Sequence, residues 1–170
     1  QSFTNVLICG LGGSGIGGTI ISQLISNECS LPIAICKDYH NPAFVNEDTL
    51  VICCSYSGNT EETLSMYEQA VAKGATIAVV TSGGKFEALA NENGLNIIKI
   101  RGGLPPRAAF GLAFPQLVFV FEKYGFISDA FLGRFDAAIE LLDKDEEQIK
   151  EGAMALAKNL LGTVPVIYAE

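Results

Sequence analysis

Three hydroxyl side chains follow an apolar run near the middle of the chain. Residues 50–54 are apolar, and Ser55, Ser57 and Thr60 come directly after them. A strand that passes into a helix here would place these hydroxyl groups beside the free backbone N–H groups of the first helical turn. Such donors bind the oxygens of a phosphate without a lysine. The pattern therefore predicts a site for a phosphate monoester.

A simple helix cap is the alternative interpretation, because Ser57, Asn59 and Thr60 are of types that commonly cap helices. A second loop favours phosphate binding. The glycine-rich segment 10–18 contains Ser14 and also follows an apolar run, and a third segment of this kind lies at 81–84. In parallel sheets the carboxyl ends of the strands meet at one edge, where ligands bind. We therefore favour binding over capping alone.

The first glycine-rich loop also fits a dinucleotide-binding pattern. Gly10, Gly12 and Gly15 form G-x-G-x-x-G, and Asp38 follows at the distance expected for a ribose contact. The pattern has little specificity, because 18 glycines in 170 residues give about 0.2 such matches by chance. A nucleotide-dependent oxidoreductase is therefore the weakest functional alternative.

The loops follow apolar runs that have the length of strands. These runs are continuous rather than alternating, which is typical of parallel strands covered on both faces. They lie at residues 6–9, 32–36, 50–54, 76–80 and 96–100. Helical patterns separate most of them, so the predicted fold is α/β, a three-layer αβα sandwich around a five-stranded parallel sheet of flavodoxin-like topology.

Mostly apolar residues at helical spacing predict which helix faces turn inward. The first stripe consists of Ile16, Ile20 and Leu24, and the second of Thr60, Leu64, Tyr67 and Val71. A short helix is expected from Lys85 to just before Gly94, and Pro105 and Pro106 can start another that runs over 107–122. Residues 128–161 are also helical in pattern and strongly acidic.

Composition excludes some classes of partner. The formal net charge is −8, with 11 Lys and Arg against 19 Asp and Glu, so a nucleic-acid-binding protein is not expected. The most apolar stretch, 108–121, is too short to cross a membrane, and we expect no membrane association. No secretory signal pattern is visible at the beginning of the sequence.

The cysteines predict a reducing compartment. Cys9, Cys29, Cys36, Cys53 and Cys54 form an odd set without C-x-x-C or zinc spacing. Most lie in or beside apolar runs, so we expect buried thiols, no metal site and a cytoplasmic location.

Three segments together resemble a known enzyme family. Ser-Tyr-Ser-Gly-Asn-Thr-Glu-Glu-Thr at 55–63 resembles the phosphate loop of sugar isomerase (SIS) domains. Gly-Gly-Ser-Gly-Ile-Gly-Gly at 12–18 and Gly-Gly-Leu-Pro-Pro-Arg-Ala-Ala at 102–109 narrow the resemblance to the bifunctional phosphoglucose/phosphomannose isomerases, which carry two SIS domains in tandem. The resemblance covers nearly the whole chain.

The resemblance implies a role for each site residue. The hydroxyl groups that would bind substrate phosphate are those of Ser14, Ser55, Ser57 and Thr60. Backbone groups of Gly13 and Tyr56 would face the sugar phosphate. Arg107 would be catalytic and stabilise the negative charge of an enediolate intermediate, which suits a guanidinium group. From its position alone, Arg107 would be an ordinary surface arginine.

The resemblance further implies aldose–ketose isomerisation of glucose, fructose and mannose 6-phosphates, without a cofactor. The family's catalytic base and ring-opening groups come from the second half, so this chain alone is expected to be inactive. His40, the single histidine, is expected to be structural or exposed. The family also implies a homodimer for the full-length protein. The functional alternative is a non-catalytic, regulatory SIS module that binds a sugar phosphate.

The predicted domain organisation has three parts. Residues 1–125 would form the SIS domain and 126–163 a helical connector. Residues 164–169 read as a new strand, so 164–170 would be the start of a second SIS domain that is cut off.

Overall fold

A computed structural model of the chain describes residues 2–168 and contains one five-stranded sheet. All pairings are parallel, and the strand order is β2-β1-β3-β4-β5. The strands are β1 (Asn5–Cys9), β2 (Ile33–Cys36), β3 (Thr49–Ser55), β4 (Thr76–Thr81) and β5 (Asn96–Lys99). This confirms the predicted parallel sheet and its flavodoxin-like order.

Burial explains why the apolar runs are continuous. Every residue of β3, the central strand, is buried, whereas both edge strands are only partly covered. A central strand of a sheet covered on both faces has no solvent side, so apolar residues occupy consecutive positions.

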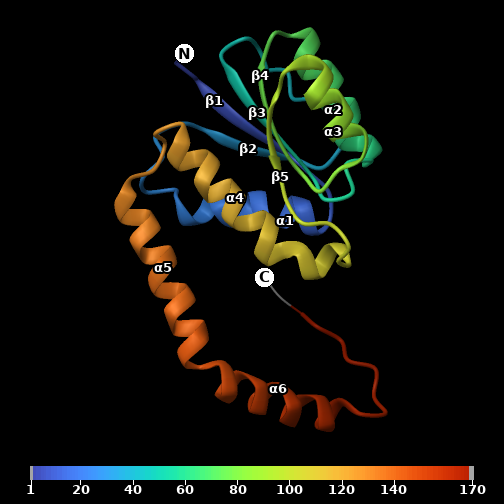
Figure 1. Cartoon of the computed structure of the whole chain (residues 1–170), viewed down its shortest axis with the longest axis vertical. Helices are drawn as coiled ribbons and strands as arrows, with labels where there is room; N and C mark the ends of the chain where they lie inside the picture. Colours follow the sequence, from blue (N-terminus) through green and yellow to red (C-terminus); the bar gives the residue numbers. More distant parts are fainter. Residues whose placement is uncertain (1, 169–170) are drawn as a thin grey trace. The chain divides into compact units, whose positions relative to one another are not determined.

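Helices cover both faces of the sheet (Figure 1). On one face lie α1 (Gly13–Leu24) and α4 (Phe110–Lys123), which contact each other. On the other lie α2 (Glu61–Ala72) and α3 (Gly84–Asn93). The expected three-layer sandwich is confirmed. The helix expected from Arg107 differs in detail, because Pro106–Ala109 forms a 3-10 turn, η1, before α4 begins.

The predicted inward stripe of α1 is wrong. Ile16 and Leu24 are 44% and 53% exposed, and Ile20 is half-buried. The buried residues of the helix are Gly15, Gly17, Gly18 and Ile21. The reason is close packing, since a Cβ atom on Gly18 would lie 2.9 Å from the Ile8 Cγ2 atom of β1. The glycine face brings α1 against the sheet and leaves the larger side chains outside.

The predicted stripe of α2 is partly confirmed. Tyr67 is buried, and Leu64 packs against the core, but Val71 is 47% exposed. The helix ends at Ala72, and its C-cap residue Lys73 is followed by Gly74 at φ 75°.

All five cysteines are free thiols. Cys9 and Cys53 are register partners on adjacent strands and share one apolar cluster. The neighbouring Cys53 thiol, through a hydrogen bond, and burial together raise the pKa of Cys9 far above its ordinary value. The buried thiols of Cys9, Cys53 and Cys54 agree with the expectation from sequence, whereas Cys29 and Cys36 are only partly buried.

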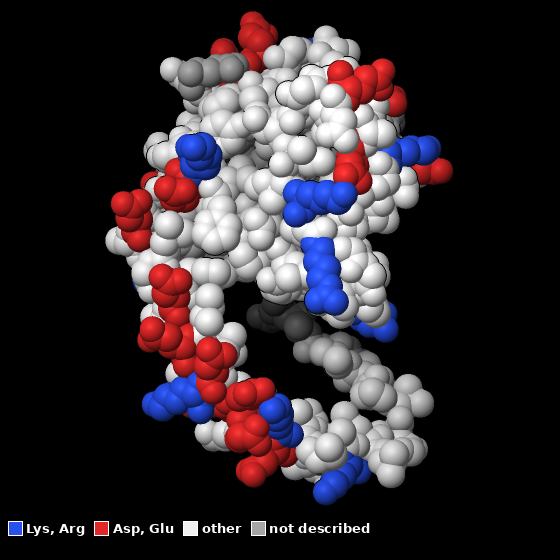
Figure 2. Space-filling model, viewed as in Figure 1, with Lys and Arg blue, Asp and Glu red and all other residues white. Residues whose placement is uncertain are grey.

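The chain divides into two compact units, residues 1–128 and 129–170. The second contains α5 (Asp129–Lys144) and α6 (Glu146–Leu160), which confirms the helical pattern expected there. Figure 2 shows many acidic side chains on these helices. Within α6, Lys150 pairs with Glu146 and Glu147 at 2.9 and 3.0 Å.

The strand expected over 164–169 is not formed within the described residues 164–168. No described strand pairs with this segment, and an unpaired strand leaves its backbone groups without partners. Ala169 and Glu170 lie outside the described residues. The division into an SIS domain, a connector and a second domain stays a prediction.

Candidate functional site

The hydroxyl-bearing loops meet where the strand order reverses. In sequence order the sheet extends from β1 to β2 on one side and from β1 to β3 on the other. The loops after β1 and β3 therefore leave the sheet side by side and pass into α1 and α2 on opposite faces. Ligands of open parallel sheets bind at this switch point.

Ser55 and Thr60 contact each other directly. The Ser55 Oγ and Thr60 Oγ1 atoms are 2.8 Å apart, and Ser55 is only 1% exposed. Thr60 precedes α2 in extended conformation, and no side chain caps this helix end. Since the Thr60 hydroxyl contacts Ser55 instead, the first N–H groups of α2 have no side-chain cap and remain available to an anion.

Ser57 and Asn59 stabilise the loop itself. The backbone N–H of Asn59 donates to the exposed Ser57 Oγ at 3.2 Å, and Asn59 Oδ1 accepts from the Lys85 N–H at 3.0 Å. Neither side chain caps α2, so the capping alternative fails for this helix.

Ser14 brings the first loop to the second. Its Oγ atom accepts a hydrogen bond of 3.3 Å from the backbone N–H of Tyr56. Gly12 is the residue before α1, and no side chain caps this helix either. Two helix beginnings without a side-chain cap and the predicted hydroxyl groups thus lie at neighbouring strand ends, although the Ser14 and Gly15 N–H groups of α1 donate to the Leu11 carbonyl.

The third loop, 81–84, uses its hydroxyl groups within the protein. Both the N–H and the Oγ of Ser82 donate to the Tyr56 carbonyl oxygen, at 3.0 and 2.6 Å. Thr81 Oγ1 donates to the Gly83 carbonyl at 2.9 Å. A Cβ on Gly58 (φ 69°) would lie 1.7 Å from that same oxygen, so only glycine fits there. This loop supports the second loop, and both of its hydroxyl groups donate within the protein.

Arg107 lies beside the first loop. It is exposed on η1, and a Cβ built on Gly13 would lie 4.0 Å from the Arg107 Cα and 3.4 Å from the Pro106 carbonyl oxygen. Among residues 2–168, the Arg107 guanidinium makes no hydrogen bond or ion pair. The structure therefore brings Arg107 next to the glycine-rich loop after β1, the first of the two loops predicted to bind phosphate. Its sequence position did not show this.

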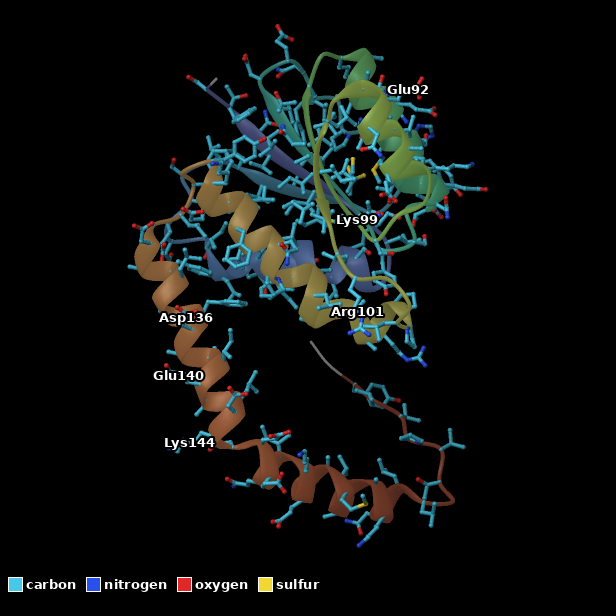
Figure 3. All side chains as sticks on the ribbon, in the orientation of Figure 1. Glu92, Lys99, Arg101, Asp136, Glu140 and Lys144 are labelled. Atoms are coloured by element: carbon cyan, nitrogen blue, oxygen red, sulfur yellow. The ribbon has the colours of Figure 1, made fainter. Side chains whose placement is uncertain are left out.

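The Tyr56 hydroxyl connects the second loop to the segment before Arg107. It donates to the Arg101 carbonyl at 3.3 Å and accepts from the Leu104 N–H at 2.9 Å. Figure 3 labels Arg101 at the start of this segment. Sequence reasoning assigned only the backbone of Tyr56 to the site, and no local pattern signals a contact between residues so far apart.

The floor of the site is apolar. A small cavity of about 10 Å³ beneath the loops is lined by Ser14, Cys54, Tyr56, Phe110 and Leu117, among others. Burial raises the pKa of the Cys54 thiol to about 12, so Cys54 is protonated at neutral pH. A larger hollow of about 660 Å³ lies elsewhere, between β5 and the second half of α4.

The acidic residues in the first turn of α2 interact with Tyr39. Glu62 and Glu61, in the first turn of α2, raise the pKa of Tyr39 by their negative charge, Glu62 the more strongly. His40 is exposed, which is one of the two expected environments.

Within residues 2–168 there is no cluster of His, Cys, Asp and Glu that could hold a metal ion. None of the described helices has the length and apolar character needed to cross a membrane.

Known proteins resemble this chain in sequence and in structure. The bifunctional phosphoglucose/phosphomannose isomerase of Caldicellulosiruptor bescii is 40% identical over 99% of the chain and 51% of its own length. The enzyme of the same name from Thermoplasma acidophilum is 41% identical over 98% of the chain and 50% of its own length. No protein-family model matches the chain.

The fold also matches a solved structure. A protein from Salmonella typhimurium, described as a phosphosugar isomerase, aligns with a TM-score of 0.70 and 20% identity, over 94% of this chain and 51% of that one. The chain has the SIS fold, as predicted, and the predicted resemblance is confirmed. The chain spans about half the length of the curated relatives it matches.

Proposed function

We propose that this chain, a homologue of the bifunctional phosphoglucose/phosphomannose isomerases with the SIS fold, is the N-terminal, phosphate-binding half of such an enzyme. The whole protein would interconvert glucose 6-phosphate with fructose 6-phosphate and mannose 6-phosphate with fructose 6-phosphate. It would act as a cytoplasmic homodimer without a cofactor.

One observation carries the proposal. Hydroxyl groups from two loops meet at two helix beginnings that no side chain caps, at the switch point of the sheet. Ser14, Ser57 and Thr60 are at least partly exposed there, whereas Ser55 lies behind Thr60 and orients its hydroxyl. Phosphate oxygens accept hydrogen bonds, and helix dipoles favour negative charge at these ends.

Arg107 would act on the sugar rather than on the phosphate. Moving a proton between C1 and C2 creates an enediolate with negative charge on oxygen, which a nearby guanidinium stabilises. This role is supported by its position beside Gly13, in the glycine-rich loop after β1. The base that moves the proton, and the group that opens the ring, would come from the other half of the protein.

Ligand binding by the chain tests the first part of the proposal. Glucose, mannose and fructose 6-phosphates should each raise its melting temperature, whereas unphosphorylated glucose and NADH should not. At ten times Kd a ligand adds about 1.4 kcal/mol, which corresponds to roughly 4 °C for a chain of this size. A shift with NADH alone would instead support the dinucleotide alternative.

Turnover tests the second part. The full-length protein should isomerise the three sugar phosphates, and Arg107→Ala should lower kcat strongly while leaving inhibition by inorganic phosphate in place. Tight sugar-phosphate binding by a full-length protein without any turnover would favour the regulatory module.

A further inference from the structure

The Tyr56 hydroxyl forms two hydrogen bonds with the segment between β5 and Arg107. All residues from Arg101 to Ala108 are exposed, and Gly103 adopts φ 88° with no atom within 4 Å of the place of a Cβ. A glycine-containing exposed segment has high conformational freedom unless hydrogen bonds hold it. The Tyr56 hydroxyl bonds to Arg101 and Leu104, the residues directly before and after Gly102 and Gly103.

Two prolines limit the backbone conformations between Leu104 and Arg107. Pro105 and Pro106 separate Leu104 from Arg107, and Pro105 has φ −56° and ψ 139°. Proline fixes its own φ and restricts the residue before it, so the backbone from Leu104 to Arg107 has few alternative conformations. A hydrogen bond at the Leu104 N–H therefore restricts the Arg107 Cα as well.

The other end of Tyr56 is held within the phosphate loops. Its backbone N–H donates to Ser14, and its carbonyl accepts two hydrogen bonds from Ser82. The residue itself lies between Ser55 and Ser57. One side chain thus connects the phosphate loops to the segment that carries Arg107.

We infer that the Tyr56 hydroxyl makes Tyr56 a positioning residue, which fixes Arg107 relative to the phosphate loop through the Leu104 N–H and the two prolines. This inference rests on the proposed function for the role of Arg107. The distance between the phosphate and the reacting carbons of a sugar phosphate is set by the sugar. An arginine held at a fixed distance from the phosphate loop would therefore already lie beside the enediolate when the phosphate is bound, without a loss of conformational entropy during the reaction.

Tyr56→Phe isolates the hydroxyl, because the ring that lines the apolar cavity remains. In this chain, the Leu104 amide should exchange its hydrogen about five times faster, since it loses its acceptor. In the full-length protein, kcat/KM for isomerisation should fall about tenfold, while inhibition by inorganic phosphate stays within twofold. On an Arg107→Ala background the same change should have no further effect on kcat/KM.

Two further variants sharpen the test. Tyr124→Phe removes another partly buried phenol hydroxyl, remote from these loops, and should leave kcat/KM unchanged. Gly103→Ala strains the same segment without touching Tyr56, because its Cβ meets no atom but its φ is positive. It should reproduce the loss of kcat/KM with phosphate inhibition retained.

Several results would overturn the inference. These are unchanged Leu104 exchange, equal losses of kcat/KM and phosphate inhibition, or an undiminished effect of Tyr56→Phe in the absence of the Arg107 guanidinium. A wild-type protein that turns over no sugar phosphate would refute the proposed function instead. The Leu104 exchange rate would then decide alone whether Tyr56 holds the segment.

Discussion

Ser55 and Ser57 are two residues apart, yet the structure predicts different consequences when each hydroxyl is removed. The Ser55 hydroxyl is buried and hydrogen-bonded to Thr60, whereas Ser57 is exposed. Ser55→Ala should therefore destabilise the fold by about 1 kcal/mol, or roughly 3 °C in melting temperature. Ser57→Ala should change stability by less than about 0.5 kcal/mol.

The same two substitutions should both weaken phosphate binding, Ser57→Ala directly and Ser55→Ala indirectly. Ser57 can reach a ligand, and a hydrogen bond to a charged group contributes about 1.5–3 kcal/mol, so Ser57→Ala should weaken binding at least tenfold. Ser55→Ala should weaken it through the misplaced Thr60 hydroxyl. Thr60→Val should weaken binding more than Ser55→Ala does, since it removes the hydroxyl that Ser55 orients.

Calorimetric titration with glucose 6-phosphate and differential scanning calorimetry of the unliganded variants measure both quantities. The assignment of Ser57 to the ligand is refuted if Ser57→Ala retains full affinity. The assignment of Ser55 to the interior is refuted if the two alanine variants have the same melting temperature without ligand.

Four other predictions concern the same loops and their support. Thr63 and Thr81 are both fully buried, but Thr63 Oγ1 has no partner among the described residues, whereas Thr81 Oγ1 donates to a carbonyl. In chemical denaturation, Thr63→Val should therefore be neutral or stabilising by up to about 1 kcal/mol, and Thr81→Val should be destabilising by about 1–2 kcal/mol. Gly58→Ala should abolish folding of the loop and phosphate binding together, because its Cβ would overlap a carbonyl oxygen; a soluble variant that still binds glucose 6-phosphate would contradict this. Burial raises the pKa of the Cys54 thiol to about 12 in the folded protein, above that of a solvent-exposed thiol. The unfolded state therefore loses this proton first, so the free energy of unfolding should fall as pH rises from about 9 towards 12. Cys54→Ala should show a shallower fall. Arg107→Lys should recover only part of the activity lost in Arg107→Ala, because an ammonium group lacks the planar fork of donors, and equal kcat values for Lys and Arg would argue against a direct contact with the oxyanion.

Much of the fold followed from local patterns. The continuous apolar runs predicted the buried parallel strands, and these strands lie within a few residues of the expected positions. Hydroxyl residues after two of those runs predicted a phosphate site, because strand ends in parallel sheets meet at one edge. Their side-by-side placement after β1 and β3 agrees with that reasoning, while their role in binding stays a prediction.

Helix orientation was predicted less well, and packing is the reason. Ile16 and Leu24 have the spacing of a buried stripe, but glycines on another side of α1 allow the helix to approach Ile8 closely. Hydrophobic periodicity reflects which side chains are apolar and not how near two backbones can come. The wrong stripe therefore follows from a steric property that periodicity does not contain.

The sequence by itself thus determined the five strands, the main helices between and after them, and the two loops that could hold a phosphate, because these depend on residues close together in the chain. Only the tertiary structure placed Arg107 beside Gly13, assigned Ser82 to the support of Tyr56, and connected the Tyr56 hydroxyl to Leu104. These contacts join residues that are 26 to 94 positions apart, the last being the separation of Gly13 and Arg107 (107 − 13 = 94). Such pairs are set by how strands and helices pack in space, and no local pattern of residues encodes that distance.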